Sequence, residues 1–312
     1  MLNDYSQLDA EARKRIDAAC GFLNHKLRQQ RNRVLMTAAW CAFGAIAVAA
    51  FLRIPPWVPL AVALLIVLLV AVRAHAEVKR WFKSMVVQRV VEALGTGLTY
   101  SRESSFDRAH FTAMDLFSER TDVFRSEDQV CGTHNQVAFA LHEAWAAKRE
   151  KRGKQTHTIV FFRGTIVALE FNKHFHGHTT VVPEAAHGLL GGLFGEFDSR
   201  KGRERVSMQD AAFEQAFSVY SSDAQQAHYL LTPKMLQLIL ETKSTMANGV
   251  RLAFRDNMLY VAVPSTQNRF EVSLLTTKVT PQQVIGDLGS ALQLVQRLIA
   301  GLDLETRIWT RV

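Results

Sequence analysis

The sequence predicts an α+β protein: a two-helix transmembrane hairpin followed by a mostly antiparallel sheet domain with flanking helices. Three observations predict this class. Two uncharged apolar stretches, 34–52 and 57–72, follow each other near the N-terminus. From residue 100 onward, apolar and polar residues alternate in several runs, as in half-buried strands. Two later segments begin with Thr-Pro and keep apolar residues at helical spacing, which is typical of capped helices.

The apolar stretches predict a membrane hairpin. The first is long enough, at about 1.5 Å per residue, to cross about 28 Å of hydrocarbon. The link between the stretches holds Arg53, Pro55 and Pro56, and prolines are tolerated there because a turn needs few backbone donors. A cleaved signal peptide does not fit, because the first stretch is too long, starts too late and is followed at once by a second.

Basic residues flank the hairpin on both sides, whereas the link has only Arg53. The positive-inside rule therefore predicts a multi-pass protein of the bacterial inner (plasma) membrane with both termini in the cytoplasm. The flanking residues are Arg13, Lys14, Arg15, Lys26, Arg28, Arg31 and Arg33 before the hairpin, and Arg73, Lys79, Arg80, Lys83 and Arg89 after it.

We expect four parts along the chain: a cytoplasmic N-terminal helix (1–33), the transmembrane hairpin (34–73), an amphipathic connecting helix (74–99) and a cytoplasmic α+β domain (100–312). The connecting helix has an apolar side that includes Val78, Phe82 and Val90, and we expect it to end at Gly95. Two arrangements remain open for it: it lies along the lipid headgroups or it docks onto the domain that follows.

Within the domain, the alternation of Val137, Phe139, Leu141 and Trp145 predicts a strand. Other strands are expected at 179–182, 217–220 and 270–274. Two hairpins are expected: 158–162 with 165–171 around Arg163-Gly164, and 251–254 with 258–263 around Asp256-Asn257. Helices are expected at 233–245 and 281–301.

Two segments of this domain are interpreted as loops. The basic run of Lys148, Arg149, Lys151, Arg152 and Lys154 is predicted to be a solvated loop between strands, in preference to a partner site. The glycine-rich stretch 185–205 predicts a long mobile loop, whose apolar residues either touch lipid or cover the core.

The charge of +8 and the pI near 9.6 are explained in large part by the basic flanks, which suit an anionic inner leaflet. No zinc finger, RNA-binding aromatic signature or arginine-rich arm is present, so we expect no nucleic-acid partner. Cys20, Cys41 and Cys131 are widely separated, which fits a reducing compartment and no disulfide framework.

The strongest candidate for a metal site is the group of His174, His176 and His178. On a strand, alternate residues share a face, so three imidazoles can converge on Zn²⁺ or Cu²⁺. The favoured interpretation is a polar strand end with solvated histidines, so no metal, catalytic or cofactor-binding residue is assigned and no cofactor is expected.

Other polar residues have ordinary explanations. His142-Glu143 begins an HExxH-like string, but Ala146 replaces the second histidine and the segment reads as a strand. Cys131, close to His134, is better explained as a buried thiol than as a nucleophile. Tyr220, Asp223 and Tyr229 fit turn and packing roles better than a surface site.

The string at 213–233, FEQAFSVYSSDAQQAHYLLTP, resembles the bacterial membrane-protein family called domain of unknown function 3137, in which F-E-x-x-F-x-V-Y-S-x-D leads into Y-x-L-T-P. The resemblance extends to segments at 128–132, 137–145, 162–164, 171–173 and 251–263. It implies a membrane-anchored protein without an assigned activity, so no catalytic residue carries over. Genes of this family are associated with neighbours of the LemA membrane-protein type, which implies a membrane complex.

These observations predict a binding or scaffolding module at the cytoplasmic face of the lipid bilayer, with a membrane-protein partner or self-association. The alternative is a metal-binding or enzymatic domain of unfamiliar type. A deep polar pocket with converging titratable groups favours the enzyme, and a flat apolar patch favours the partner site.

Overall fold

The computed structural model describes residues 5, 8–95, 97–170, 177–184, 202–245, 249–265 and 271–301. The chain divides into two compact units, which we describe separately. The helical unit comprises residues 1–96 and 269–290, and the sheet unit comprises 97–268 and 291–312.

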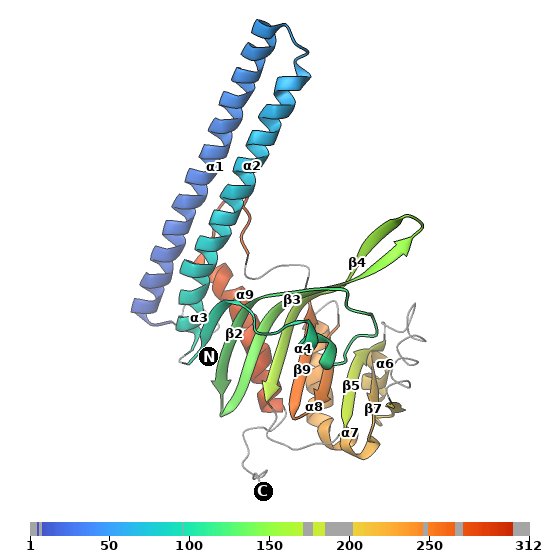
Figure 1. Ribbon diagram of the computed structural model, residues 1–312. Helices are drawn as coiled ribbons and strands as arrows, with labels where there is room; N and C mark the ends of the chain where they lie inside the picture. Colours follow the sequence, from blue (N-terminus) through green and yellow to red (C-terminus); the bar gives the residue numbers. More distant parts are fainter. Residues whose placement is uncertain are drawn as a thin grey trace. The chain divides into compact units, whose positions relative to one another are not determined.

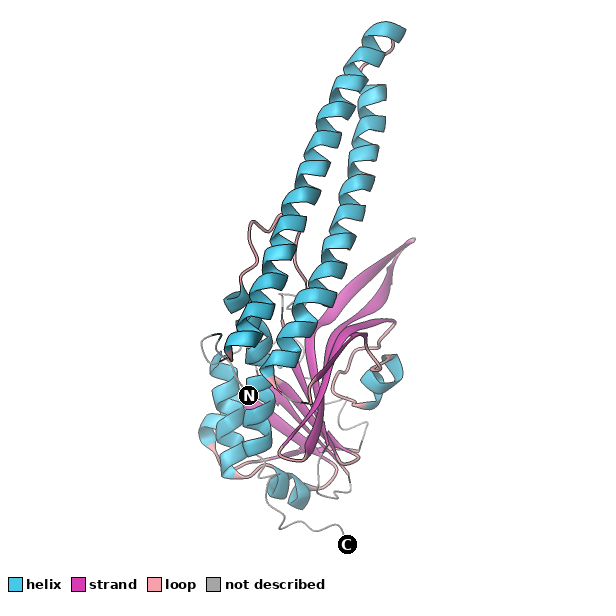
Figure 2. Cartoon of the chain, turned by 90° about the vertical axis from the view of Figure 1, so that its left-hand side faces the viewer, coloured by secondary structure: helices cyan, strands magenta, loops and turns pink. Residues whose placement is uncertain are grey.

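Two long antiparallel helices form most of the helical unit (Figures 1 and 2). Helix α1 (Ala10–Leu52) starts at Asp9, whose side chain accepts a hydrogen bond from Ala12 N, and ends at Arg53, which has a φ of +53°. Helix α2 (Trp57–Trp81) continues through a π-helical turn, η2 (Phe82–Val87), into α3 (Gln88–Leu94). The N-terminal helix and the first apolar stretch are therefore one helix of 43 residues.

Toward the link, the large apolar side chains of both helices point outward. Both helices are long and apolar enough to cross a membrane, and only 6% and 11% of their most apolar windows are buried. Trp40, Phe43, Phe51 and Trp57 are among the exposed side chains.

The other half of the helix pair has a packed interior. Apolar residues of α1 are buried in the same part of the unit as the apolar side of η2 and α3, and α1 contacts both of these elements. The apolar side of the predicted connecting helix thus packs on α1. Lys83, one of the basic flanking residues, is also buried. The buried residues are Ile16, Cys20, Leu23 and Leu27 of α1, with Val78, Phe82, Val86, Val90 and Leu94.

The segment 271–280 completes the helical unit. We predicted a strand at 270–274, and this was wrong for the described residues 271–274. Ser273 instead closes a turn, because its side chain accepts from Leu275 N (3.2 Å) and its carbonyl from Thr276 N (3.0 Å). Glu271 pairs with Lys79 of α2, and the segment leads into α9 (Pro281–Gly301), the helix predicted at 281–301.

Among its described residues, the sheet unit has a nine-stranded sheet in which every neighbouring pair is antiparallel. The spatial order is β1-β2-β3-β4-β9-β8-β5-β7-β6. The strands are β1 (Thr99–Glu103), β2 (Val123–His134), β3 (Val137–Arg152), β4 (Gln155–Glu170), β5 (His178–Pro183), β6 (Glu204–Val206), β7 (Phe217–Ser221), β8 (Arg251–Arg255) and β9 (Met258–Pro264). The predicted α+β class is confirmed.

Short helices flank the sheet: α4 (Arg108–Ala113), α6 (Ala211–Ala216), α7 (Ala224–Leu230) and α8 (Pro233–Thr245). Aspartates cap three of them, since Asp107, Asp210 and Asp223 accept from the backbone N–H three residues on. Aromatic rings around α4, including Phe106, Phe111, Phe117 and Phe162, form a buried cluster on one face of the sheet, against Ala144, Ala146 and Ile166.

Two predictions about β3 and β4 were wrong. Most of the basic run is no loop, because Lys148 to Arg152 continue β3, and only Lys154 lies in the turn that it forms with Gly153. Arg163-Gly164 is no hairpin turn, because β4 runs straight through it. A glycine is required there for another reason: a Cβ at Gly164 would lie 2.0 Å from Val263 O of β9.

The hairpin around Asp256-Asn257 is confirmed, and both residues have positive φ, as a two-residue turn of type I′ requires. The strands predicted at 179–182 and 217–220 are β5 and β7, and the helix predicted at 233–245 is α8. The predicted loop at 185–205 lies outside the described residues as far as 201, and its last two residues belong to β6.

Candidate functional site

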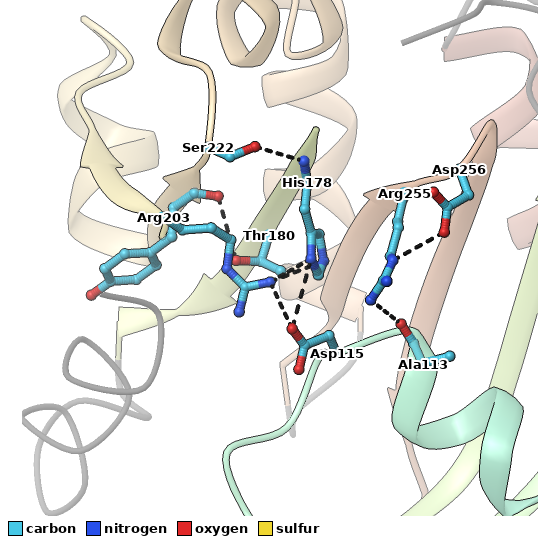
Figure 3. A network of polar contacts seen from close by, with 9 residues as sticks. Ala113, Asp115, His178, Thr180, Arg203, Ser222, Arg255 and Asp256 are labelled. Atoms are coloured by element: carbon cyan, nitrogen blue, oxygen red, sulfur yellow. Dashed lines mark hydrogen bonds and ion pairs between the residues drawn. The ribbon is translucent and has the colours of Figure 1, made fainter. Parts of the chain in front are cut away.

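Three charged or titratable side chains from distant parts of the sequence meet at one end of β5 (Figure 3). We call Asp115, His178 and Arg203 the Arg203 cluster. Arg203 is 1% exposed, and its Nη1 donates to Asp115 Oδ2 at 3.3 Å. The same Nη1 lies against the His178 ring, 3.2 Å from Nε2 and closer to Nδ1.

The backbone explains how each member reaches the cluster. His178 is the first residue of β5, and its N–H donates to Ser222 Oγ at 2.9 Å, just after β7. Arg203 directly precedes the edge strand β6. Asp115 follows α4 with a φ of +54°, a left-handed conformation that aspartate tolerates better than most residues.

The charges of the cluster are balanced within it. A buried guanidinium needs a nearby anion because desolvating it alone is costly, and the Asp115 carboxylate provides that anion. The His178 nitrogen that faces an arginine N–H can accept a hydrogen bond from it, and the same ring lies 3.9 Å from Asp115 Oδ2. A neutral imidazole beside a guanidinium and a carboxylate can accept a proton or help to bind a small anion.

Two further arginines hold the same short segment. Arg255 Nη1 donates to Ala113 O at 2.6 Å (Figure 3), and Arg251 Nη1 donates to Leu116 O at 3.5 Å. The Arg251 guanidinium also lies 4.9 Å from the centroid of the Phe117 ring, and burial lowers the pKa of Arg251. We call Arg203, Arg251 and Arg255 the arginine clasp, because together they fix residues 113–116 against the sheet.

A second polar group lies toward the opposite edge of the sheet, near β1. His142 is buried, stacks on Phe106 with ring centroids 4.9 Å apart, and has Nδ1 2.9 Å from Ser104 Oγ. Burial, with a smaller contribution from the charge of His110, lowers the pKa of His142 to about 4. This histidine is therefore a neutral core residue at physiological pH.

Tyr100 and Asp128 form a related contact. The Tyr100 hydroxyl donates to Asp128 Oδ1 at 2.5 Å, and burial together with this hydrogen bond raises the pKa of Tyr100. Asp128 has a φ of +50° at the bulge where the β2–β3 register shifts between Glu127 and Gln129.

The residues singled out from the sequence do not gather at one place. Of the histidine trio, His178 joins the Arg203 cluster, whereas His174 and His176 lie outside the described residues. Tyr220 is buried in β7, Asp223 caps α7 and Tyr229 is exposed. Within the described ranges, no group of three or more His, Cys, Asp or Glu side chains is placed to hold a metal.

Sequence reasoning missed Asp115, Arg203 and the two arginines of β8. Arg251 and Arg255 are four residues apart at the two ends of β8, so they share a face of the strand, although the predicted strand stopped at residue 254. Nothing in the local sequence points to Asp115 or Arg203, because their contact joins residues 88 positions apart.

The described parts include a groove between two helices and a cavity in the sheet unit. A groove of about 370 Å³ lies between α1 and α2 near the link, lined by small and apolar residues such as Gly44, Ala45 and Ala63. In the sheet unit, a cavity of about 290 Å³ lies between α8 and the end of α9, lined by Lys234, Gln237, Leu238, Glu241, Arg297 and Ala300.

Fold and site together define a class: an antiparallel sheet domain that follows a pair of helices of membrane-spanning length. Residues 160–304 match the model of a family described as "protein of unknown function (DUF3137)", which confirms the resemblance predicted from the string at 213–233. The similar segments at 128–132 and 137–145 precede the matched range.

Among solved structures, the chain is similar to the crystal structure of the mycobacterial trehalose monomycolate transport factor A, TtfA. The identity is 14% and the TM-score 0.38, with 70% of this chain and 94% of that chain covered. A search of curated protein sequences finds no match.

Proposed function

We propose that this protein is a membrane-anchored binding or scaffolding module whose sheet unit works at the cytoplasmic face of the bacterial inner membrane. The observation that carries the proposal is the exposure of the two apolar helices. Only 6% and 11% of their apolar windows are buried, so the helix pair leaves most of its large side chains without protein cover. Such an apolar surface is stable in contact with the lipid tails of a membrane.

The distribution of charge supports the orientation. Basic residues stand on both sides of the hairpin and Arg53 alone lies in the link, which favours a hairpin with both ends in the cytoplasm. Beyond the apolar windows, α1 and the helix that continues from α2 bury apolar side chains against each other. This packing supports an anchor whose two helices are held together outside the lipid.

The use of the charged side chains in the sheet unit supports binding over catalysis. Arg251 and Arg255 donate to backbone carbonyls, and Asp107, Asp210 and Asp223 cap helices. Each of these contacts holds part of the backbone of the sheet unit in place. A membrane-protein partner or a second copy of the chain is the partner we propose.

Reporter fusions test the anchoring and its direction. An enzyme that is active only outside the cytoplasm should be silent after Val312 and active when inserted in the link after Arg53. A fluorescent protein that matures only in the cytoplasm should give the opposite result. Activity of the external reporter after Val312 would contradict the cytoplasmic assignment. Release of the chain by carbonate washing would contradict membrane insertion itself.

The alternative is a metal-binding or enzymatic domain, and the polar surroundings of His178 are the observation that favours it. Metal content of the chain, purified without a histidine tag, separates the two classes. We expect less than stoichiometric Zn²⁺ or Cu²⁺. About one equivalent, lost when His174 and His176 are replaced by Gln, would favour the metal site. These two replacements leave the contact between His178 and Arg203 intact.

A further inference from the structure

The far ends of β3 and β4 form a two-stranded ribbon that leaves the sheet. The pairing of β3 with β2 stops at Ala147, and the pairing of β4 with β9 stops at Gly164. Beyond these points the two strands pair only with each other, as far as Arg152 and Gln155. Figure 1 shows this ribbon extending past the neighbouring strands. We call residues 148–160 the basic ribbon.

The two faces of the ribbon differ in charge. On one face, Glu150 lies 2.7 Å from Lys148 and 3.6 Å from Arg152, so an acid partly neutralises the two bases. The other face carries Arg149 and Lys151, which stand opposite Thr158 and Thr156 in the register. No residue of the ribbon supplies an acid to this second face.

The nearest acid at the base of the ribbon is already engaged. Asp122 accepts from the backbone N–H of Arg149 at 2.9 Å through Oδ2, and from Arg120 Nε at 2.6 Å through Oδ1. These hydrogen bonds lower the pKa of Asp122 and hold it as a carboxylate directed at those donors. Arg149 and Lys151 are both exposed, so their charges face solvent.

We propose that the face formed by Arg149, Lys151, Thr156 and Thr158 binds the anionic phospholipid headgroups of the membrane that anchors the chain. The inference rests on the proposed function. Phosphate groups match two cations flanked by hydroxyl donors, and an anionic leaflet attracts basic residues near its surface. Val160, 49% exposed and opposite Ala147 at the base of the same face, adds an apolar contact.

The membrane anchor explains how two basic residues are enough for binding to lipid headgroups. Two or three basic residues give only a weak attraction to a membrane when the protein is free in solution. A tethered domain meets the leaflet at a high effective concentration, so a weak contact becomes populated without new interactions. A single-stranded nucleic acid is the poorer match, because residues 148–158 contain no phenylalanine, tyrosine or tryptophan on which bases stack.

The experiment uses the full chain in lipid nanodiscs. Cys20, Cys41 and Cys131 are replaced by alanine, and a spin label is attached at Thr156→Cys, which lies close to the turn and on the face proposed to bind, opposite Lys151. Collision with oxygen, which concentrates in lipid, is compared with collision with an aqueous nickel complex. Discs of phosphatidylcholine alone are compared with discs that hold about 30 mol% phosphatidylglycerol, a typical anionic leaflet.

We expect the ratio of oxygen to nickel collisions to rise at least about twofold in anionic discs and to return to the lower value in about 0.5 M salt, because salt screens headgroup attraction. The rise should be lost in Arg149→Glu/Lys151→Glu and in the milder Arg149→Gln/Lys151→Gln. The control Arg102→Glu/Arg108→Glu makes the same change in net charge at exposed positions of β1 and α4 and should keep the rise.

Three outcomes would overturn the inference. The first is a ratio of oxygen to nickel collisions that is the same in both kinds of disc. The second is a rise of this ratio in anionic discs that is unchanged in Arg149→Glu/Lys151→Glu. The third is a label that stays aqueous in anionic discs but is shielded in native membranes, which would indicate a protein partner. Co-elution of the chain with the discs is scored separately. A chain that fails to enter discs contradicts the proposed anchoring, whereas a chain that enters them with an aqueous label contradicts only the headgroup contact.

Discussion

Asn24 and Val279 are joined by a pair of hydrogen bonds, although 255 residues separate them in the sequence. Asn24 Nδ2 donates to Val279 O at 2.9 Å, and Val279 N donates to Asn24 Oδ1 at 2.8 Å. One amide side chain of α1 thus satisfies both backbone groups of Val279, which lies two residues before the start of α9. The contact ties the first helix to the late segment of the same unit.

Asn24→Ala should lower the free energy of unfolding by about 1–3 kcal/mol, because it leaves the two backbone groups of the buried Val279 without their partner. Thermal unfolding in detergent measures the loss. His25→Ala, at the next and exposed position of α1, is the matched control and should change stability by less than about 0.5 kcal/mol. Equal effects of both replacements would contradict the role of the pair.

Arg203→Met should destabilise the sheet unit by about 3 kcal/mol, because Asp115 is mostly buried and loses its cation. Asp115→Asn keeps the left-handed backbone and an acceptor but removes the carboxylate from the buried guanidinium of Arg203, so it should destabilise the unit by a similar amount. Arg205→Met is the control, since that side chain is half exposed and lies 4.0 Å from its nearest acid. A double-mutant cycle between Arg203 and Asp115 measures their coupling, and a coupling near zero would contradict the buried pair.

Gly164→Ala should be among the most damaging single replacements in the sheet. Its Cβ would lie 2.0 Å from Val263 O and 2.9 Å from Pro264 Cα, both on the backbone, so β4 and β9 would have to separate. We expect a loss of about 3 kcal/mol or more, or failure to fold. Gly286→Ala on the exposed side of α9 meets nothing within 4 Å and should stabilise the helix by up to about 1 kcal/mol. Melting temperatures of the two variants should therefore move in opposite directions.

His142 should make stability depend on pH. Its pKa of about 4 in the folded protein lies below the 6.5 of the unfolded chain, so the unfolded chain binds more protons between these values. The stabilisation is complete above pH 6.5 and is lost as pH falls toward 4, by about 3 kcal/mol in all. Unfolding at pH 7.5, 6 and 5 in wild type and in His142→Gln measures this contribution. A variant with the same pH slope as wild type would show that His142 is not the titrating group.

Local sequence patterns determined the elements that depend on near neighbours. The apolar stretches, the Thr-Pro helix starts and the Asp256-Asn257 turn all appear where they were predicted, since each needs only a few adjacent residues. The string at 213–233 pointed to the family for the same reason, because it is a contiguous motif.

The tertiary structure decided which side chains meet and where strands end. The sequence predicts a turn at Gly164, and only the close approach of β9 shows that the missing side chain lets two strands pair there. The sequence of the basic run predicts a loop, because a row of charged residues gives no signal for strand pairing. In the structure, cross-strand pairs make most of this run one strand of a ribbon. In the sequence, Asp115 and Arg203 are of residue types that usually lie on the surface. Only the topology of the sheet brings these two side chains into contact. The spacing of apolar residues predicts which face of one helix or strand is buried. The contacts described here depend instead on register and packing between elements that are distant in the chain.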